Sequence, residues 1–361
     1  MVVLDDDRTE RDRLGEMLNV EDLKIETLGP SSISETTAAI ADVLEGDGPR
    51  VVLLDYRLDD AEEASNFRGG SVAATLRDAD ATRDVPLVLL TTEAKLTAWV
   101  ESRPGTQDLF DWRLLKGDLR EEELPLIRSR LADLANGYWT LSGGELAQEG
   151  GWDRIAAALG TERERIASLE DLESELPGGE SPAEIGRWIL TGPLEWPGPL
   201  IDQDEARVVL GVSGESFAGS AVQEWLVPHA YTGLFLAFGP RWWSAPLRGA
   251  VADIAGPPGL VDSHARTKAL SEVVGARLEA ENCSWCDGAR TVHVCRVCCR
   301  AVDAAHSVRM LAARPPNWAD PRVACYTCIA QGRAEDVQLV PEARNIVEKL
   351  ETGELEQPER E

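Results

Sequence analysis

The first third of the chain alternates short apolar runs with amphipathic stretches, and this alternation restricts the folds open to it. Apolar runs at residues 2–4, 24–28, 51–54, 86–90 and 112–115 are expected to be β-strands. The run at residues 51–54 contains no polar residue, which is typical of a central strand buried on both faces. Strands that alternate with helices predict a five-stranded parallel sheet covered by helices on both faces.

The amphipathic stretches between these runs are expected to be helices. They lie at residues 8–18, 34–44, 70–77 and 120–135, and Ser34 is the expected N-cap of the second. The predicted fold class is therefore α/β with a doubly wound sheet. Ligands of such sheets bind beyond the carboxyl ends of the strands.

Polar side chains stand at those strand ends. They are Asp5, Asp6 and Asp7 after the first strand, Asp55 at the end of the third, Thr91 at the end of the fourth and Lys116 after the fifth. Because parallel strands end at one edge, these residues are expected to converge. Crowded carboxylates repel each other, and oxygen-only ligands suit Mg²⁺. A carboxylate there can attack a phosphoryl group while the lysine and the hydroxyl hold its oxygens.

Four segments resemble, in order, the receiver domains of response regulators over about residues 1–135. They are VVLDDD at 2–7, VVLLDYRL at 51–58, PLVLLTT at 86–92 and LLK at 114–116. The resemblance implies a flavodoxin-like fold in which Asp55 accepts phosphate from a histidine kinase or a phosphotransfer protein. It also implies Mg²⁺ bound by Asp5, Asp6, Asp55 and the backbone carbonyl of Arg57. Thr91 would be the switch hydroxyl and Lys116 the cation that contacts the phosphate.

Some positions depart from the receiver pattern. They are Thr92 in place of a small residue, Arg113 in place of an aromatic switch residue with Trp112 one position earlier, Gly117 in place of proline, and a long connection after Asp55 that carries acidic residues at 59–63. These departures put the usual switch mechanism in question more than the phosphorylation. The alternative is a pseudo-receiver that keeps the fold without cycling phosphate.

All seven cysteines lie between Cys283 and Cys328. Six of them form Cys-x-x-Cys pairs at 283/286, 295/298 and 325/328, a spacing that favours zinc over disulfides. Three pairs are one pair short of two tetrahedral sites, and Asp303 and His306 are candidates for the missing ligands. Cys299 is surplus and is expected to be a buried thiol.

The cysteine pattern resembles cross-braced double-zinc fingers of the FYVE and RING kind, as a small treble-clef module at residues 281–333. The resemblance assigns Cys283, Cys286, Asp303 and His306 to one zinc, and Cys295, Cys298, Cys325 and Cys328 to the other. A rival interpretation is an HNH-like nuclease, with His306 and Asn317 at a metal that activates water. It would make the chain a phosphorylation-gated nuclease or a phage-defence effector. Reduced cysteines without metal are a third interpretation.

The remaining regions carry no catalytic motif. Residues 139–280 are rich in tryptophan and expected to be mainly helical, with helices near 152–159, 182–190, 204–210 and 220–225 and a connecting helix at 260–279. Their tryptophans are expected in the core. Residues 334–361 form an acidic tail with at most one helix.

Charge and hydropathy restrict the partners. The net charge of −28 disfavours nucleic acid, which is bound through lysine and arginine. Arg290, Arg296 and Arg300 are expected to meet an acidic partner or the acidic surface of this same chain. No apolar run is long enough for a membrane span and no leader peptide is recognisable, so a cytoplasmic location is expected. The first strand begins abruptly at Met1, which suggests a start further upstream.

These observations predict a bacterial two-component response regulator, with Mg²⁺ at the receiver and Zn²⁺ in the cysteine module. The bacterial origin rests on the high content of Ala, Arg, Gly and Glu, which is typical of a GC-rich genome. The expected chemistry is limited to phosphotransfer and autodephosphorylation, and the zinc module is expected to bind a protein partner.

Overall fold

The computed structural model describes residues 1–19, 24–58, 66–92, 109–163, 181–311, 315–334 and 337–355. The chain divides into two compact units. The first unit consists of Met1–Gly192 with Thr232–Phe238, and the second of Pro193–Tyr231 with Gly239–Glu361. The domain boundaries expected near residues 135, 280 and 333 do not coincide with this division and stay predictions.

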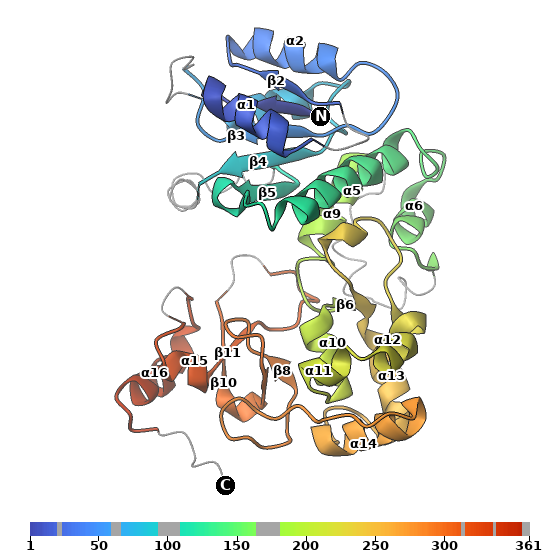
Figure 1. Cartoon of the computed structure of the whole chain (residues 1–361), viewed down its shortest axis with the longest axis vertical. Coiled ribbons are helices and arrows are strands. Elements are labelled where there is room, and N and C mark those ends of the chain that lie inside the picture. The colour runs from blue at the N-terminus through green and yellow to red at the C-terminus, as the bar shows by residue number, and fades with distance from the viewer. Residues whose placement is uncertain are drawn as a thin grey trace. The chain divides into compact units, whose positions relative to one another are not determined.

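A five-stranded sheet forms the centre of the first unit (Figure 1). Its strands are β1 (Val2–Leu4), β2 (Glu26–Leu28), β3 (Val52–Asp55), β4 (Leu87–Thr91) and β5 (Trp112–Leu115). They lie in the order β2-β1-β3-β4-β5, and every neighbouring pair is parallel. This order is that of a flavodoxin-like doubly wound fold, so the predicted fold class is confirmed.

The helices of the first unit follow the predicted pattern with shifted ends. They are α1 (Arg8–Met17), α2 (Ile33–Val43), α3 (Gly69–Asp78), α5 (Leu124–Ser142), α6 (Gly151–Ala158) and α9 (Pro182–Thr191). The predicted N-cap Ser34 is wrong. Ser32 caps α2 instead, because its hydroxyl accepts from the amide of Glu35 while the Glu35 carboxylate reaches back to the Ser32 amide. Helix α5 continues to Ser142, beyond the predicted end near residue 135.

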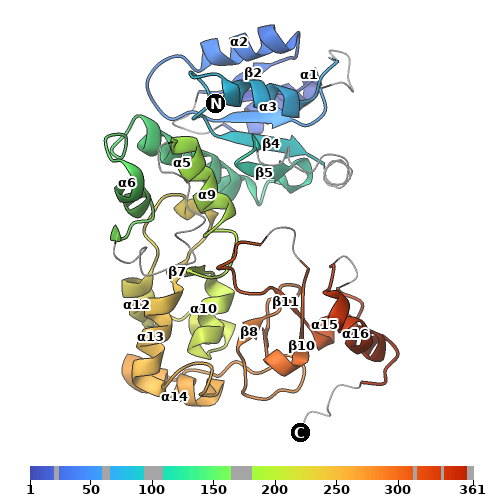
Figure 2. The same ribbon diagram turned by 180° about the vertical axis from the view of Figure 1, so that it is seen from behind.

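Residues 93–108 of the connection between β4 and β5 and the acidic stretch at residues 59–63 lie outside the described residues. Among the described ones, alternate strand residues form one continuous core with α2 and α3 (Figure 2). This core contains Val2, Leu4, Val52, Leu54, Leu87 and Leu89 from the strands, Ile40 from α2, and Val72 and Leu76 from α3. The strands β1, β3 and β4 are buried on both faces, as expected for a parallel sheet.

A buried carboxylate joins several elements at the start of β5. The Asp111 side chain is fully buried, and its Oδ2 lies 2.5 Å from Nη2 of Arg77 in α3. The same oxygen accepts from the amide of Leu87 at 2.7 Å, and Oδ1 lies 3.2 Å from Nε of Arg187 in α9. One carboxylate therefore links α3, β4 and α9 to β5, so its loss leaves two arginines without their counter-charge.

The second unit has a helical part with one short pair of antiparallel strands among its described residues. It contains α10 (Gln203–Leu210), α11 (Gly214–Phe217), α12 (Ser220–Leu226), α13 (Ser244–Ala255), α14 (Ser263–Val274), and the antiparallel pair β6 (Leu200–Ile201) and β7 (Trp242–Trp243). Of the tryptophans at residues 139–280, which were predicted to lie in the core, Trp242 and Trp243 are buried and the other five are half-buried. Helix α14 is shorter than the predicted connecting helix and contributes Leu270 to the core, so it is not a mere connection.

The described residues of the cysteine region form two short antiparallel strand pairs and two α-helices. They are β8 (His293–Val294) with β9 (Ala301–Val302), β10 (Ser307–Arg309) with β11 (Val323–Cys325), α15 (Tyr326–Ala330) and α16 (Arg344–Glu351). Helix α16 comes from the expected acidic tail, and both views show it beside α15 (Figure 1, Figure 2). Its Leu350 packs in the same core as Trp285 and Tyr326.

Within the described part of the chain, no helix has the length and hydropathy needed to cross a membrane. The cytoplasmic location stays a prediction.

We expect Asp111→Ala to destabilise the first unit by about 3 to 5 kcal/mol, because it removes the buried carboxylate that neutralises the largely buried guanidinium of Arg77. Urea unfolding followed by circular dichroism measures this change. The control is Asp80→Ala, since the Asp80 side chain is 89% exposed beside Arg83. Equal midpoints for the two variants would contradict the structural role assigned to Asp111.

Candidate functional site

Three carboxylates crowd the carboxyl edge of the sheet. Asp5 and Asp6 follow β1, Asp55 ends β3, and one carboxylate oxygen from each lies within 4.8 Å of the other two. These residues are only 1%, 4% and 2% exposed, respectively. The structure therefore brings together the acidic residues that the strand-end pattern predicted to converge.

Lys116 supplies a positive charge to this cluster. It follows β5, and its Nζ lies 2.6 Å from Asp5 Oδ2 and 2.7 Å from Asp55 Oδ1. Burial alone would lower the pKa of Lys116, but the charges of Asp55 and Asp5 and their hydrogen bonds outweigh this effect and raise it. The side chain is therefore an ammonium at neutral pH, positioned to contact a group carried by Asp55.

Backbone and side-chain donors hold the acidic residues in place. The amide of Arg57 donates to Asp55 Oδ2 at 2.9 Å, and the amide of Asp7 donates to Asp5 Oδ1 at 2.9 Å. Asp7 itself caps α1 by accepting from the Thr9 amide. The buried Arg11 donates through Nη1 to the carbonyl of Asp5 at 2.7 Å. Sequence reasoning did not single out Arg11, since nothing local distinguishes it from the other arginines of that amphipathic helix.

Thr91 lies at the same edge. Asp55 pairs with Leu90 across β3 and β4, so Thr91 is one residue beyond the partner of Asp55. Thr91 itself pairs with Leu115 of β5, the residue before Lys116. It is 1% exposed, and its hydroxyl donates to the Thr92 carbonyl at 3.3 Å. The five predicted phosphate-site residues thus share one edge of the sheet.

This arrangement fits a divalent cation that prefers oxygen ligands. Three nearly buried carboxylates repel each other strongly, and Lys116 offsets only part of their charge. Mg²⁺ suits such a set because it binds a few carboxylates and keeps several waters. Asp5, Asp6 and Asp55 are the side chains that would hold it.

Gly69 packs directly against Asp55. A Cβ on Gly69 would lie 2.2 Å from the Asp55 carbonyl oxygen, whereas a Cβ on Gly70 would have no atom within 4 Å. We expect Gly69→Ala to displace the end of β3, lowering stability by about 1 to 3 kcal/mol and weakening Mg²⁺ binding. Calorimetric titration with Mg²⁺ measures the effect. Gly70→Ala is the matched control and should bind Mg²⁺ with the affinity of wild type. Equal stability and equal Mg²⁺ affinity of the two variants would refute the close packing of Gly69 on Asp55.

Four cysteines of the second unit form a compact cluster. The Sγ atoms of Cys295, Cys298, Cys325 and Cys328 all lie within 4.8 Å of one another. Cys295 and Cys328 are 3.9 Å apart, and Cys298 and Cys325 are 3.8 Å apart. A tetrahedral zinc with bonds of about 2.3 Å separates its sulfurs by about 3.8 Å. The cluster therefore has the dimensions of a structural zinc site.

The thiols of this cluster perturb one another. Hydrogen bonds from Cys295 and Cys298 lower the pKa of Cys325, while hydrogen bonds to Cys295 and Cys325 raise the pKa of Cys298. The cluster thus favours one thiolate and disfavours further ionisation among its neighbours. A divalent cation removes that conflict, because it binds thiolates.

A second group contains Cys283, Cys286 and His306. Their ligand atoms lie within 4.8 Å of one another, with Cys283 Sγ 3.7 Å from His306 Nδ1. Asp303, the predicted fourth ligand, is not in this group. Its Oδ1 accepts from the Ala305 amide, which caps the short helix η5 (Ala304–His306). Its charge still contributes to the raised pKa of Cys286, after the larger effect of burial, so the carboxylate is near that thiol.

The expectation that Cys299 is a buried thiol is wrong. Cys299 is exposed and has a φ of 56°, because it turns the chain out of the loop that holds Cys295 and Cys298. Its amide donates to the Cys295 carbonyl at 2.8 Å.

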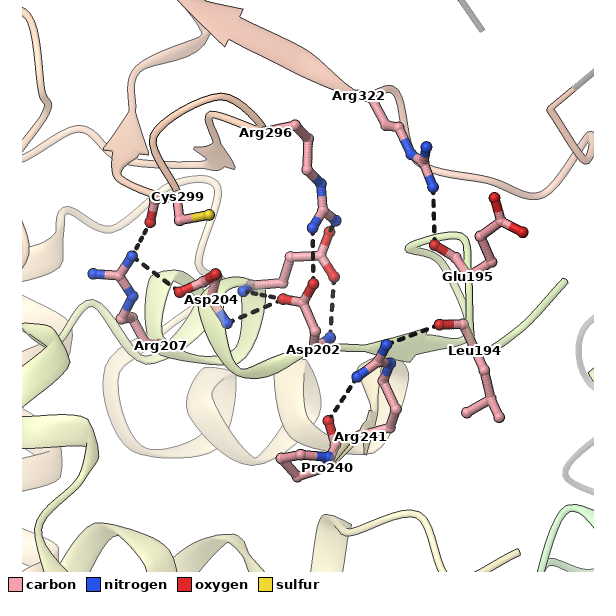
Figure 3. Close-up of polar contacts among 11 residues, drawn as sticks. Leu194, Glu195, Asp202, Asp204, Arg207, Pro240, Arg241, Arg296, Cys299 and Arg322 are labelled. Carbon is pink, nitrogen blue, oxygen red and sulfur yellow. Dashed lines mark hydrogen bonds and ion pairs between the residues drawn. The ribbon is translucent and has the colours of Figure 1, made fainter. Parts of the chain in front are cut away.

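Arg296, between Cys295 and Cys298, joins the Cys₄ loop to helix α10 (Figure 3). Its Nη1 lies 2.8 Å from Oδ2 of Asp202, the N-cap of α10, and Nη2 pairs with Glu205. Burial raises the pKa of Glu205 to about 7; the charge of Asp202 adds to the rise and that of Arg296 opposes it. Arg296 thus meets the acidic surface of its own chain, one of the two outcomes expected for it.

Two further arginines support this contact region of the second unit (Figure 3). Arg207 of α10 pairs with Glu281 at 3.0 Å and donates to the carbonyl of Cys299. Arg322 donates to the Glu195 carbonyl at 3.0 Å and stacks 3.8 Å over the Trp196 ring. No short motif pointed to these contacts, because each joins residues about 75 to 130 positions apart in the sequence.

The nuclease interpretation requires His306 to serve a metal that activates water. In the structure His306 faces the Cys283 thiol, and its ring packs edge-on against Tyr326 at 5.9 Å. Two thiols beside one imidazole are a donor set for zinc. This placement favours a structural role for His306.

No family model matches this chain, and no curated protein matches it in sequence. Solved structures resemble part of it. The N-terminal domain of a response regulator receiver protein from Methanoculleus marisnigri JR1 is 22% identical, over 36% of this chain and 89% of that chain, with a TM-score of 0.23.

Two other solved structures cover a similar share of the chain. An adenylate cyclase from Rhodopirellula baltica is 18% identical over 39% of this chain and 88% of that chain, with a TM-score of 0.28. NtrX from Brucella abortus is 20% identical over 37% of this chain and 27% of that chain, with a TM-score of 0.29. Sequence identities and TM-scores this low carry no argument about function. The assignment of the fold therefore rests on the order of the strands in the sheet.

Proposed function

We propose that the chain is a two-component response regulator whose first unit is phosphorylated on Asp55. The observation that carries the proposal is the contact of Lys116 Nζ with both Asp5 and Asp55, at 2.6 and 2.7 Å, beside three converging carboxylates. Lys116 also neutralises part of the carboxylate charge, and from this position its ammonium can contact a phosphoryl group carried by Asp55. A histidine kinase or a phosphotransfer protein is the expected phosphate donor.

Each residue of the cluster has a chemical role in this proposal. An Asp55 oxygen forms the bond to phosphorus as the bond from phosphorus to the donor nitrogen breaks, and the donor keeps that electron pair. Lys116 and the Thr91 hydroxyl bind phosphoryl oxygens, and the Arg57 amide holds the second Asp55 oxygen in place. Mg²⁺ bound to Asp5, Asp6, Asp55 and the Arg57 carbonyl would neutralise the charge of the phosphoryl group.

Incubation with acetyl phosphate and Mg²⁺ tests the proposal. We expect intact-mass spectrometry to show one added phosphoryl group on the wild type, and none on Asp55→Asn, because the amide is a poor nucleophile. Asp80→Asn, which changes an exposed carboxylate of the same unit, should be labelled as wild type is. Failure of the wild type to be labelled by acetyl phosphate or by any histidine kinase would identify a pseudo-receiver instead.

We also propose that the cysteine region holds two structural zinc ions. One is bound by Cys295, Cys298, Cys325 and Cys328, and the other by Cys283, Cys286 and His306, with Asp303 as fourth ligand. The sulfur separations of 3.8 and 3.9 Å support the first site. Arg296 is engaged with α10, whereas Arg290 and Arg300 are exposed and could meet a protein partner.

Elemental analysis of the purified protein tests the zinc proposal. We expect two zinc ions per chain in the wild type, and one in Cys298→Ser and in His306→Ala, because each change removes a ligand of one site. The matched control is Cys299→Ser, next to Cys298, which should retain both ions. Absence of zinc from the wild type would overturn the proposal, and a single ion that His306→Ala keeps would leave only the Cys₄ site.

A further inference from the structure

The segment Thr232–Phe238, called the strap below, has an unusual place in the chain. It packs within the first unit, although the residues on both sides of it, Pro193–Tyr231 and Gly239–Glu361, belong to the second unit. The chain therefore leaves the second unit, contacts the first for seven residues, and returns. The strap consists mainly of apolar residues and ends in the short helix η4 (Leu236–Phe238).

Phe235 anchors the strap in a socket on α5. Its side chain is fully buried, and its ring lies 5.9 Å from the ring of Tyr138. The socket exists because residue 137 is glycine: a Cβ there would lie 2.3 Å from Phe235 Cε1. Phe235 also has a φ of 66°, a left-handed conformation that costs energy for a residue with a side chain. Docking of the ring therefore maintains a backbone conformation that a free segment would abandon.

Charged side chains of α5 hold the strap backbone beside this socket. Asp133 Oδ2 accepts from the Ala237 amide at 2.8 Å, and Arg130 Nε donates to the Ala237 carbonyl at 3.2 Å. The Arg130 guanidinium also lies 5.6 Å from the centre of the Phe238 ring. On the other side, the Leu234 amide donates to the Ala158 carbonyl at the end of α6, at 2.8 Å. These hydrogen bonds and ring contacts fix the strap against α5 and α6.

The strap also contacts the strand that ends at the acidic cluster. The Phe238 ring packs edge-to-face on Trp112, with centroids 5.4 Å apart. Trp112 is the first residue of β5, and Lys116, which contacts Asp5 and Asp55, directly follows that strand. β5 is the last strand in the sheet order, and within the described residues of the sheet its neighbour is β4. A shift of Lys116 could therefore move β5 and, through Trp112, change the contact with Phe238 of the strap.

We propose that docking of the strap on α5 and β5 is coupled to the state of Asp55, and that this coupling carries the signal to the second unit. The inference rests on the proposed phosphorylation of Asp55. A phosphoryl group there draws Lys116 away from the carboxylates toward new oxygens, which displaces β5 and weakens the contact of Trp112 with Phe238. Release of Phe235 from its socket relieves its left-handed backbone and frees the chain that runs into the second unit at both ends.

Thermodynamic reciprocity makes the coupling measurable. If a phosphoryl group favours the undocked strap, undocking must favour the phosphoryl group by the same factor. Beryllofluoride with Mg²⁺ serves as the phosphoryl mimic on the full chain. We expect it to raise the hydrogen-exchange rates of residues 232–238. We also expect Phe235→Ala, which empties the socket, to bind the mimic about fivefold or more tightly than wild type.

The control is Leu236→Ala, because Leu236 is 51% exposed in the same segment. This variant should show the hydrogen-exchange rates of wild type at residues 232–238 and bind beryllofluoride with the affinity of wild type. Phe235→Leu, which keeps an apolar side chain, replaces Phe235→Ala if that variant does not fold. Two results together would overturn the strap proposal. The mimic would bind without changing the hydrogen-exchange rates of residues 232–238, and the Phe235 and Leu236 variants would bind it with equal affinity. The proposed phosphorylation of Asp55 would then be unaffected. No binding of the mimic to wild type, with no acetyl phosphate labelling, would overturn both.

Discussion

The central constraint on this protein is the crowding of three carboxylates at one edge of a parallel sheet. Asp5, Asp6 and Asp55 are nearly buried and within reach of one another, and such a group persists only where positive charge offsets their repulsion. Lys116 provides part of that charge from the end of β5, and the remaining excess favours a divalent cation. The proposed phosphorylation and the proposed coupling of the strap both depend on this balance.

The second unit has a comparable constraint, which is the crowding of four cysteine thiols in one cluster. Four thiols that perturb each other's ionisation are compatible in one cluster when a cation binds them as thiolates. The loop that carries two of them also presents Arg296 to the N-terminus of α10. The cysteine region is therefore built into the helical part of its unit, unlike an independent finger on a flexible tether.

The strap gives the two units a shared segment of chain. A strained backbone conformation persists only where surrounding contacts hold it. The left-handed backbone of Phe235 is held by its ring in the Gly137 socket. Beside it, Asp133 and Arg130 hold the backbone of Ala237. The proposed release of this segment would remove its contacts with α5 and with Trp112 at the start of β5. Such a release would suit the proposed response regulator, whose residues Thr92, Arg113 and Gly117 depart from the receiver pattern.

The sequence by itself determined the α/β sheet, the five residues at its polar edge and the three Cys-x-x-Cys pairs. These follow from local rules, since strands and helices have short periods, parallel strands end at one edge, and a Cys-x-x-Cys turn presents two thiols together. Only the tertiary structure decided the socket of Phe235 at Gly137, the burial of Asp111 between Arg77 and Arg187, the pairing of Arg296 with α10 and the exposure of Cys299. Most of these depend on contacts between residues far apart in the chain, and no local pattern encodes which distant side chain fills a given space.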